Sequence, residues 1–340
     1  MQKKNLYFIT GGCGFIGSNF IEILLKKGEK IVNLDSYSYA ANKAINKRLL
    51  KYKNYTFYKG SYGNIFLLKK IFAKHNRINK VINFAAESHV DNSINGPLLF
   101  IKNNVYDFSI FLKECANYYK TNKISKFIFL HVSTDEVYGS LKLKQKSFTE
   151  KNKYFPNSPY SSSKASSDLI ARSWYKTYKF PVIITNCSNN YGKYQNFEKL
   201  IPLTIKRALN HKKIPIYGNG KNIRDWLHVN DHCEALYLIS KAGVPGEQYN
   251  IGGGKEISNI KIVKMICNYL DKILPLKKRK YSSFISFVKD RLGHDFRYSV
   301  NFKKIKSELN WKPKVKFSTG LNDTVKWYVE ELKKKKIKHK

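Results

Sequence analysis

The chain passes from strand to helix through Leu6-Tyr7-Phe8-Ile9-Thr10-Gly11-Gly12-Cys13-Gly14-Phe15-Ile16-Gly17. The apolar run at 6–10 is typical of a buried strand, and the apolar spacing from 15 to 25 is that of a helix. The glycines between them satisfy both Gly-x-Gly-x-x-Gly and Gly-x-x-Gly-x-x-Gly. Glycine permits a tight turn there and lets the backbone approach a pyrophosphate at the helix N-terminus. This segment therefore predicts a dinucleotide-binding turn.

Strand and helix patterns continue to alternate through the first half of the chain. We expect strands at 30–34, 55–59, 80–84 and 127–132, and a long helical stretch from 98 to 119. This alternation predicts an α/β fold, a doubly wound parallel sheet of the Rossmann type with right-handed crossovers.

The pattern changes beyond residue 186, where prolines and glycines break the chain into shorter elements before a helix expected over 258–274. We therefore predict an NAD-binding Rossmann domain over 1–186, a smaller C-terminal substrate-binding lobe over 187–330, and a basic tail over 331–340. The apolar residues 181–185 predict a strand of the main sheet, so we expect some later segments to return to the first domain.

Asp35 stands at the end of the second predicted strand. An acid at this place accepts hydrogen bonds from the adenosine ribose hydroxyls and disfavours a 2′-phosphate, which predicts NAD rather than NADP. Asn83-Phe84-Ala85-Ala86-Glu87-Ser88 closes a later strand, and its small residues leave room for a cofactor at the sheet's crevice. The same alanines would also suit simple helix packing.

Tyr160 and Lys164 are predicted to share one face of a helix. Ser158 is a suitable N-cap, and Pro159 suits the first helical position. Residues four apart on a helix are neighbours, so the ammonium, together with a cationic nicotinamide, is expected to lower the pKa of Tyr160. Tyr160 would then take the proton from a sugar hydroxyl while the nicotinamide accepts hydride.

Thr134-Asp135-Glu136 follows another predicted strand, whose end faces the same crevice. Once a sugar carbon is oxidised to a ketone, the neighbouring carbon becomes acidic. Glu136 is then a candidate base, and Asp135 a candidate acid toward a leaving hydroxyl if burial raises its pKa. Consecutive strand residues point to opposite faces, so both can act on one substrate only if the chain curls there. A solvated acidic loop is the alternative.

The net charge of +39 comes from 63 Lys and Arg against 24 Asp and Glu. Such an excess ordinarily suggests nucleic-acid binding. Lysine greatly outnumbers arginine, however, and the excess is spread along the chain. We interpret it, including Lys277-Lys278-Arg279-Lys280 and 333–336, as solvated surface, and expect no nucleic-acid partner. The charge would favour encounter with an anionic nucleotide-sugar.

The five cysteines show no Cys-x-x-Cys spacing, and His228 with His232 lack an evident third ligand. We therefore expect no metal site. Scattered thiols fit a reducing compartment. The apolar run after the first two lysines is too short for a signal peptide, and no later run reaches membrane-spanning length. These features predict a cytoplasmic protein that does not enter a membrane.

Over nearly its whole length the chain resembles the extended short-chain dehydrogenase/reductase superfamily and, within it, the dTDP-glucose 4,6-dehydratase family. The resemblance rests on the glycine turn, Ala85 to Asp91, Ser133 to Gly139, Ser158 to Asp168 and Thr185 to Gly192. It continues through 198–202, 215–218, 224–226, 290–291 and 293–295. The Thr-Asp-Glu triplet separates these dehydratases from epimerases of the same fold.

The resemblance implies a role for each matching residue. Thr134, Asp135, Glu136, Tyr160 and Lys164 would be catalytic, with Thr134 steadying the C4 hydroxyl of the sugar. The cofactor contacts would be Gly11, Gly12, Gly14, Phe15, Ile16, Gly17, Asp35, Ser36, Ser38, Ser61, Tyr62, Phe84, Ala85, Ala86, Glu87, Asn103, Tyr160, Lys164 and Asn190. The substrate contacts would be Ser88, Thr134, Asn189, Lys199, Leu200, Pro215, Ile216, Tyr217, Arg224, Asn259, Asp290, Arg291, Leu292, Gly293 and His294.

The chain also departs from the family pattern. Asn83 stands where the family usually has His, and Asn92 where it has Arg. Ser61-Tyr62 replaces an Asp-Ile pair that brackets the adenine, and Lys193 and Leu292 replace prolines. None of these changes removes a catalytic group, although the one at Ser61 is expected to weaken NAD retention.

The expected function is conversion of dTDP-glucose to dTDP-4-keto-6-deoxyglucose and water through transient oxidation at C4 by bound NAD, a lyase reaction of deoxysugar and cell-surface polysaccharide biosynthesis. The family also implies a homodimer. The alternatives are a 4,6-dehydratase of another nucleotide-sugar, a non-catalytic NAD-binding regulator, and a basic nucleic-acid binder. The intact Tyr, Lys, Asp and Glu argue against the regulator, and no recognition motif supports the nucleic-acid binder.

Overall fold

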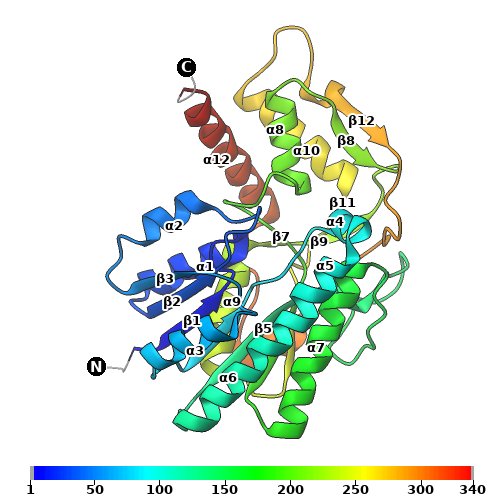
Figure 1. Cartoon of the computed structure of the whole chain (residues 1–340). Helices are drawn as coiled ribbons and strands as arrows, with labels where there is room; N and C mark the ends of the chain where they lie inside the picture. Colours follow the sequence, from blue (N-terminus) through cyan, green and yellow to red (C-terminus); the bar gives the residue numbers. More distant parts are fainter. Residues whose placement is uncertain (1–3, 338–340) are drawn as a thin grey trace.

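In the computed structural model, which describes residues 4–337, a seven-stranded parallel sheet forms the centre of the larger part of the molecule (Figure 1). Its strand order is β10-β6-β5-β4-β1-β2-β3. The strands are β1 (Leu6–Thr10), β2 (Lys30–Asp35), β3 (Tyr55–Lys59), β4 (Lys80–Asn83), β5 (Ile128–Thr134), β6 (Val182–Cys187) and β10 (Gln248–Ile251). The predicted α/β fold is confirmed. The order reverses between β1 and β4, where doubly wound sheets open a ligand crevice at the carboxyl ends of their strands.

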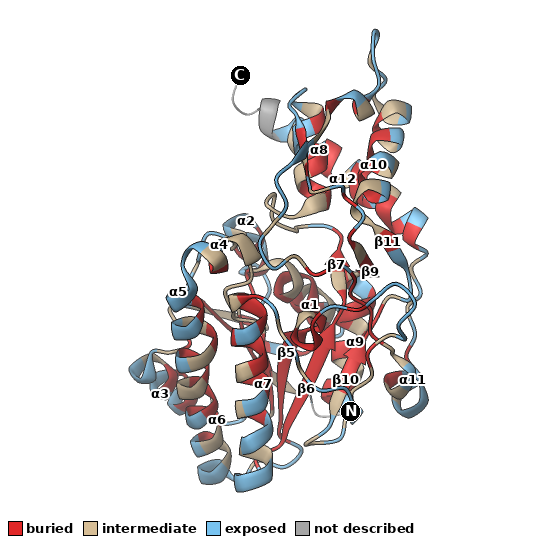
Figure 2. Ribbon diagram, turned by 90° about the vertical axis from the view of Figure 1, so that its right-hand side faces the viewer, coloured by how far each residue is buried: buried red, intermediate tan, exposed pale blue. Residues whose placement is uncertain are grey.

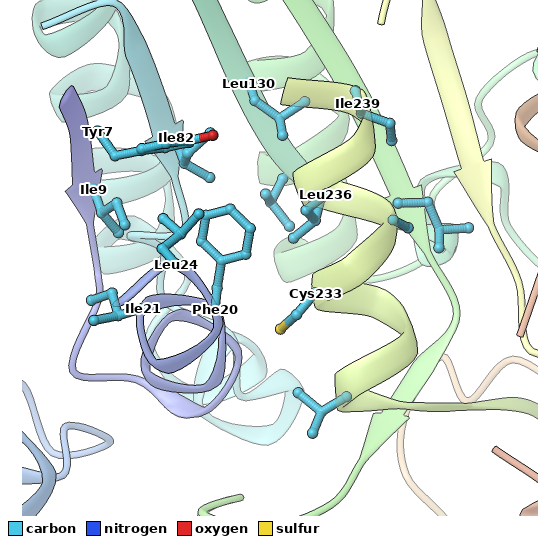
Figure 3. Packing of buried hydrophobic residues seen from close by; sticks show 14 of the residues in the cluster. Tyr7, Ile9, Phe20, Ile21, Leu24, Ile82, Leu130, Cys233, Leu236 and Ile239 are labelled. Carbon is cyan, nitrogen blue, oxygen red and sulfur yellow. The ribbon is translucent and has the colours of Figure 1, made fainter. Parts of the chain in front are cut away.

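Helices cover both faces of this sheet (Figure 2). One face carries α1 (Phe15–Lys26), α2 (Lys43–Leu49) and α9 (Val229–Ala242), and the other α3 (Ile65–Lys74), α6 (Phe108–Asn122) and α7 (Pro159–Tyr178). Figure 3 shows Phe20 and Leu24 of α1 meeting Cys233 and Leu236 of α9 above the sheet. Burial of apolar surface on both faces holds the strand ends, and hence the crevice, in place.

The helix expected over 98–119 is interrupted. The structure has α4 (Val90–Asn95), α5 (Pro97–Ile101), a π-helical segment η1 (Lys102–Asp107) and then α6. Within η1 the Asn104 side chain accepts from the Glu87 N–H (2.8 Å) and donates to the Glu87 carbonyl (2.9 Å) and to Ser163 Oγ (2.9 Å). The widened turn thus ties the helix to the loop after β4, a use of π-helix that recurs at functional sites.

The smaller part lies above the carboxyl edge of the sheet (Figure 1). Its strands are β7 (Asn189–Tyr191), β9 (Ile223–His228) and β11 (Glu256–Ser258) in one sheet, and β8 (Ile214–Tyr217) with β12 (Ile285–Val288) in another. Its helices are α8 (Leu200–Leu209), α10 (Asn259–Ile273), η3 (Tyr281–Phe284) and α12 (Phe317–Ile337). Residues of α8, α10 and α12 form a separate apolar cluster.

The chain crosses between the two parts more than once. The boundary placed after residue 186 falls inside β6, and β10, α9 and α11 (Lys303–Leu309) pack with the main sheet. α12 continues through Ile337, and Leu332 packs against the apolar cluster of the smaller part, so 331–337 of the expected basic tail are helical. Residues 338–340 lie outside the described residues. Within 4–337 no helix is long and apolar enough to span a bilayer.

Candidate active site

A cavity of about 310 Å³ opens at the carboxyl ends of β1 to β6. It collects residues from the β1–α1 turn, the segments after β2, β3 and β4, η1, the end of β5, α7, and the chain between β6 and α8. Of the expected cofactor residues, those that line it are Gly11, Gly14, Phe15, Ile16, Gly17, Asp35, Ser36, Ser38, Ser61, Tyr62, Phe84, Ala85, Ala86, Glu87, Asn103, Tyr160, Lys164 and Asn190.

Close approach of backbone explains the glycines of the first turn. Gly11 has φ +69°, and a Cβ there would lie 2.7 Å from Ala85 N. A Cβ on Gly17 would lie 2.5 Å from Gly11 O. Gly12 does not line the cavity; its N–H donates to Asn33 Oδ1 (3.1 Å), which fastens the turn to β2. The turn presents the N-terminus of α1 to the cavity, which suits a pyrophosphate.

Asp35 ends β2 and is buried. Its Oδ2 accepts from the Cys13 N–H (2.8 Å) and its Oδ1 from the Tyr37 N–H (2.8 Å). Burial raises the pKa of the carboxyl, and these two hydrogen bonds oppose the rise. A carboxylate has about four acceptor positions, so these two backbone bonds leave room for ribose hydroxyls.

The segment Ser61-Tyr62, a departure from the family pattern, is held by its own contacts. Ser61 Oγ accepts from the Gly63 N–H (3.1 Å), and the Tyr62 hydroxyl donates to the Asn103 carbonyl (2.5 Å). The Tyr62 ring meets Phe111 edge to face at 5.7 Å. Both residues therefore line the cavity from an ordered turn before α3.

Tyr160 and Lys164 project from the first turns of α7, which begins with the expected Ser158 cap and a reciprocal bond from Ser161. Lys164 Nζ donates to the Val132 carbonyl of β5 (3.0 Å). Burial lowers the pKa of Lys164, and burial together with the charge of Glu136 raises the pKa of Tyr160 well above its usual value. The expected lowering of the Tyr160 pKa included a bound cationic nicotinamide, and the protein groups alone do not produce it.

Thr134, Asp135 and Glu136 reach the cavity because the chain curls as soon as β5 ends. Thr134 caps a 3₁₀ turn, η2 (Asp135–Tyr138), and its Oγ1 accepts from the Glu136 N–H (3.3 Å). This turn places both carboxyls among the cavity-lining residues, as the proposed chemistry requires.

The two carboxyls differ in their surroundings. Burial, with Glu136 next in size, raises the pKa of Asp135 well above its usual value, and its Oδ2 accepts no hydrogen bond from the described residues. Burial also raises the pKa of Glu136, but Arg224, Lys199 and Arg291 oppose that rise. Paired carboxyls whose pKa values are pushed apart are the arrangement of an acid and a base.

The expected substrate residues fall into two groups. Ser88, Thr134, Asn189 and Lys199 line the cavity. The others lie in the smaller part, outside the cavity lining: Leu200, Pro215, Ile216, Tyr217, Arg224, Asn259, Asp290, Arg291, Leu292, Gly293 and His294.

Several of this second group lie at the junction between the two parts. Arg291 donates to both oxygens of Asp91 (2.6 and 3.1 Å), and the Tyr217 hydroxyl donates to the same carboxylate (3.2 Å). Lys199 Nζ donates to the Ser88 carbonyl (2.9 Å). Cationic side chains from the smaller part are thus held beside the sheet's crevice.

Sequence reasoning missed part of the lining. These residues are Leu34, Ala40, Ala41, Gly60, Val132, Ser133, Cys187, Ser188, Gln195, Asn196 and Glu198. The rule that ligands bind at carboxyl strand ends could have found Val132, Ser133 and Cys187. Gln195 and Asn196 come from the loop before α8, and nothing in the sequence pattern marked them.

Histidines and cysteines form no metal centre in the described part of the chain: residues 4–337 contain no group of three or more His, Cys, Asp or Glu placed to hold an ion. His228 caps α9, whereas His232 is buried with its Nδ1 3.0 Å from Asn190 Oδ1. All five cysteines are free and buried.

The dinucleotide turn, the Asp at the end of β2 and the Tyr–Lys pair of α7 together define a nicotinamide-dependent short-chain dehydrogenase/reductase of the extended type. A family model described as GDP-mannose 4,6 dehydratase matches residues 8–324. The dTDP-glucose 4,6-dehydratase of Haemophilus influenzae is 45% identical over 328 residues, which cover 94% of this chain and 97% of the relative. The chain belongs to the dTDP-glucose 4,6-dehydratase family.

Solved structures agree. The dTDP-glucose 4,6-dehydratase of Streptomyces venezuelae, determined with NAD bound, superposes with a TM-score of 0.87 at 39% identity, covering 96% of this chain and 97% of that one. The Bacillus anthracis dTDP-glucose 4,6-dehydratase in complex with NAD gives 0.85 at 42%, covering 97% and 98%.

Proposed function

We propose that this protein is a lyase that converts dTDP-glucose to dTDP-4-keto-6-deoxyglucose and water with NAD as a bound cofactor. The observation that carries the proposal is that one cavity is lined by both the oxidation pair, Tyr160 and Lys164, and the dehydration pair, Asp135 and Glu136. Epimerases of this fold need the first pair alone, whereas loss of water needs an acid and a base as well.

NAD fits the residues present. The amides at the start of α1 suit the pyrophosphate, and the free acceptor positions of Asp35 suit the adenosine ribose. Ser36, Ser38, Ser61 and Tyr62 would line the adenosine end, and Phe84 to Glu87, Asn103, Asn190 and Lys164 the nicotinamide end. When bound, NAD would supply reversible hydride transfer, with hydride lost from sugar C4 and gained at C6.

Tyr160 removes the proton from the C4 hydroxyl in this scheme, and Thr134 steadies that oxygen. The raised pKa of Tyr160 means that the protein groups alone hold its proton. The positive charge of an oxidised nicotinamide would oppose that rise, so proton removal is favoured only in the loaded site. Lys164 would hold the nicotinamide ribose from the next turn of α7.

Glu136 then removes the proton from C5, next to the new ketone, and Asp135 protonates the C6 hydroxyl as it leaves as water. Glu136 returns its proton to C5 when C6 receives hydride. The assignment follows from the surroundings: Asp135, whose pKa is raised well above the usual value, carries a proton to give. Three cations favour the ionised form of Glu136, which can therefore accept one.

The substrate diphosphate would meet the cationic side chains of the smaller part. Arg224 is buried, with its guanidinium over the Tyr298 ring at 4.4 Å, and Lys199 lines the cavity. Guanidinium groups suit bidentate phosphate contacts. The remaining expected contacts are Ser88, Asn189, Leu200, Pro215, Ile216, Tyr217, Asn259, Asp290, Arg291, Leu292, Gly293 and His294.

A homodimer is part of the proposal. The outer surface of α5, η1 and α7 exposes large apolar side chains at Leu98, Leu99, Ile101, Tyr106 and Leu169, and patches of this kind are typical of interfaces. Light scattering during gel filtration of the parent and of Leu169→Glu tests it, because a dimer using this surface should dissociate in the variant. We also propose a cytoplasmic location and a role in cell-surface polysaccharide synthesis.

Incubation of the purified protein with dTDP-glucose, UDP-glucose and GDP-mannose, followed by mass analysis, tests the function. We expect loss of one water from dTDP-glucose, and none with Tyr160→Phe. The family model named for GDP-mannose makes that sugar the second candidate. Dehydration of GDP-mannose alone would replace the proposed substrate, and no dehydration of any sugar would refute the proposal.

A further inference from the structure

A buried polar network that takes no part in the proposed reaction lies directly behind the catalytic residues. Its centre is Asp168, one helical turn after Lys164 on α7 and 1% exposed. Asp168 Oδ2 accepts from the Tyr154 hydroxyl (2.9 Å) and from Asn186 Nδ2 (3.0 Å). Buried carboxylates are costly unless the fold uses their charge or their geometry.

Asn186 connects this carboxylate to the dehydration pair. The same Nδ2 that bonds Asp168 also donates to the Thr134 carbonyl (3.0 Å), at the point where β5 ends and η2 begins. Asp168 therefore joins the helix that carries Tyr160 and Lys164 to the turn that carries Asp135 and Glu136.

His131 of β5 contacts the other oxygen of the carboxylate. Its Nε2 lies 3.2 Å from Ser167 Oγ and 3.2 Å from Asp168 Oδ1, which accepts no hydrogen bond from the described residues. Burial lowers the pKa of His131 to about 4, so the ring is neutral near pH 7.

Two neighbours decide which nitrogen of His131 carries the proton. Thr10 Oγ1 donates to Asn83 Oδ1 (2.5 Å), so the Asn83 amide turns its Nδ2 toward His131. This Nδ2 lies 3.1 Å from His131 Nδ1, and because an amide nitrogen can only donate, Nδ1 must accept. The Ser167 hydroxyl donates to the Lys164 carbonyl (2.8 Å) and is left to accept from Nε2. The proton therefore sits on Nε2, directed at Ser167 and Asp168. Asn83, where the family usually has His, thus has a definite role.

Asp168 also lies one helical turn from Lys164 on α7, and the neutral His131 leaves the carboxylate as the charged member of the network. Asp168 is the largest influence that raises the pKa of Lys164 against the effect of burial. Three titratable groups interact electrostatically with Lys164: His131 of β5, Cys187 of β6 and Asp168 of α7. Tyr160 of α7 and Asp135 and Glu136 of η2 line the same cavity.

We propose that Asp168 is a positioning residue that holds α7 against the end of β5 and places a negative charge one helical turn from Lys164. His131, oriented by Asn83, keeps its Nε2–H on the carboxylate side of this network. The inference rests on the proposed function, since Lys164 must stay protonated to assist oxidation at C4.

The first test compares pH profiles of kcat for the parent, Asp168→Asn and Asp168→Glu. Without the carboxylate the pKa of Lys164 falls, so Lys164 loses its proton sooner and the alkaline limb moves to lower pH. We expect this shift in Asp168→Asn. Misplacement of the catalytic side chains of α7 should also reduce kcat by up to about 10²-fold, with KM little changed. Asp168→Glu should restore the limb.

Asp231→Asn is the matched control, because Asp231 is also a buried carboxylate and lies outside the cavity lining. Its side chain accepts from the Lys314 and Val315 N–H groups (3.1 and 2.9 Å). It should lower the Tm and leave the alkaline limb in place. An alkaline limb in Asp168→Asn that coincides with that of the parent overturns the proposal.

A second test needs no substrate, so its outcome is separate from that of the proposed function. Asp168→Asn alone leaves a buried ammonium without its opposite charge, which is strongly destabilising. Adding Lys164→Met removes the ammonium, so the double variant should have a higher Tm than Asp168→Asn. If Asp168→Asn does not fold, the double variant should still be recovered as folded protein. Additive losses of Tm, or a double variant that also fails to fold, contradict the proposal.

Discussion

Replacement of Glu136 by Gln separates the two halves of the proposed reaction. The substitution retains the shape of the side chain and removes the base. Tyr160 and Lys164 suffice for oxidation at C4, whereas Glu136 is needed only once C4 is a ketone. Glu136→Gln should therefore bind dTDP-glucose and accumulate reduced nicotinamide, yet release little 4-keto-6-deoxy product.

The size of the effect follows from the site. Glu136 lies in a buried cavity where Arg224, Lys199 and Arg291 favour its ionised form, and the amide cannot ionise. Loss of general base catalysis typically costs about 10²–10⁴-fold. We expect the steady-state rate to fall within that range while the first oxidation stays near the parental rate.

The assay is a single-turnover measurement of nicotinamide absorbance with product analysis of the same sample. Tyr160→Phe is the contrasting variant, since it should block the reduction itself. Glu114→Gln is the matched control, because Glu114 is a buried carboxylate on α6, outside the cavity, and its loss should not change the rate. Turnover of Glu136→Gln at the parental rate would show that Glu136 is not the base.

Four further outcomes are expected. The purified protein should contain NAD, measurable by absorbance after denaturation, because a cofactor that ends each turnover unchanged need not leave; full activity of NAD-free protein without added NAD would refute this. Gly17→Ala should reduce the NAD content, since the new Cβ would lie 2.5 Å from Gly11 O, and equal content in parent and variant would contradict it. Because burial raises the pKa of Glu136, the rate should fall as pH drops through that raised value, where the base gains a proton. Arg224→Gln removes a cation that opposes the rise, so this acid limb should move to higher pH. A kcat–pH profile of the parent and the variant would detect the shift. Binding to DNA should be weak, independent of sequence and strongly reduced by salt in a filter assay; a tight complex with one preferred sequence would overturn the interpretation of the excess charge.

Local pattern predicted the sheet and the glycine turn, and the family resemblance implied much of the cavity lining. The strand that follows Asn5, the glycine turn and the helix from Phe15 come one after another in the chain. Their hydrophobic periodicity and backbone freedom can therefore be recognised within a few neighbouring residues. The same holds for Ser158 and Tyr160, where cap and helix face follow from spacing alone.

The structure supplied what depends on residues far apart in sequence. The 98–119 stretch reads as one helix, and only the contacts of Asn104 with Glu87 and Ser163 show why it widens into a π-helical turn. The raised pKa of Tyr160 follows from burial, which no spacing reveals.

The sequence by itself determined the class of sheet, the cofactor turn and which side chains could carry the chemistry, because each follows from periodicity or from residue type within one segment. Tertiary structure decided whether Asp135 and Glu136 could act together, through the 3₁₀ turn that ends β5. It also decided how Asn83, His131 and Asp168 connect across three elements, since hydrogen bonds between distant segments exist only after the sheet and α7 have packed.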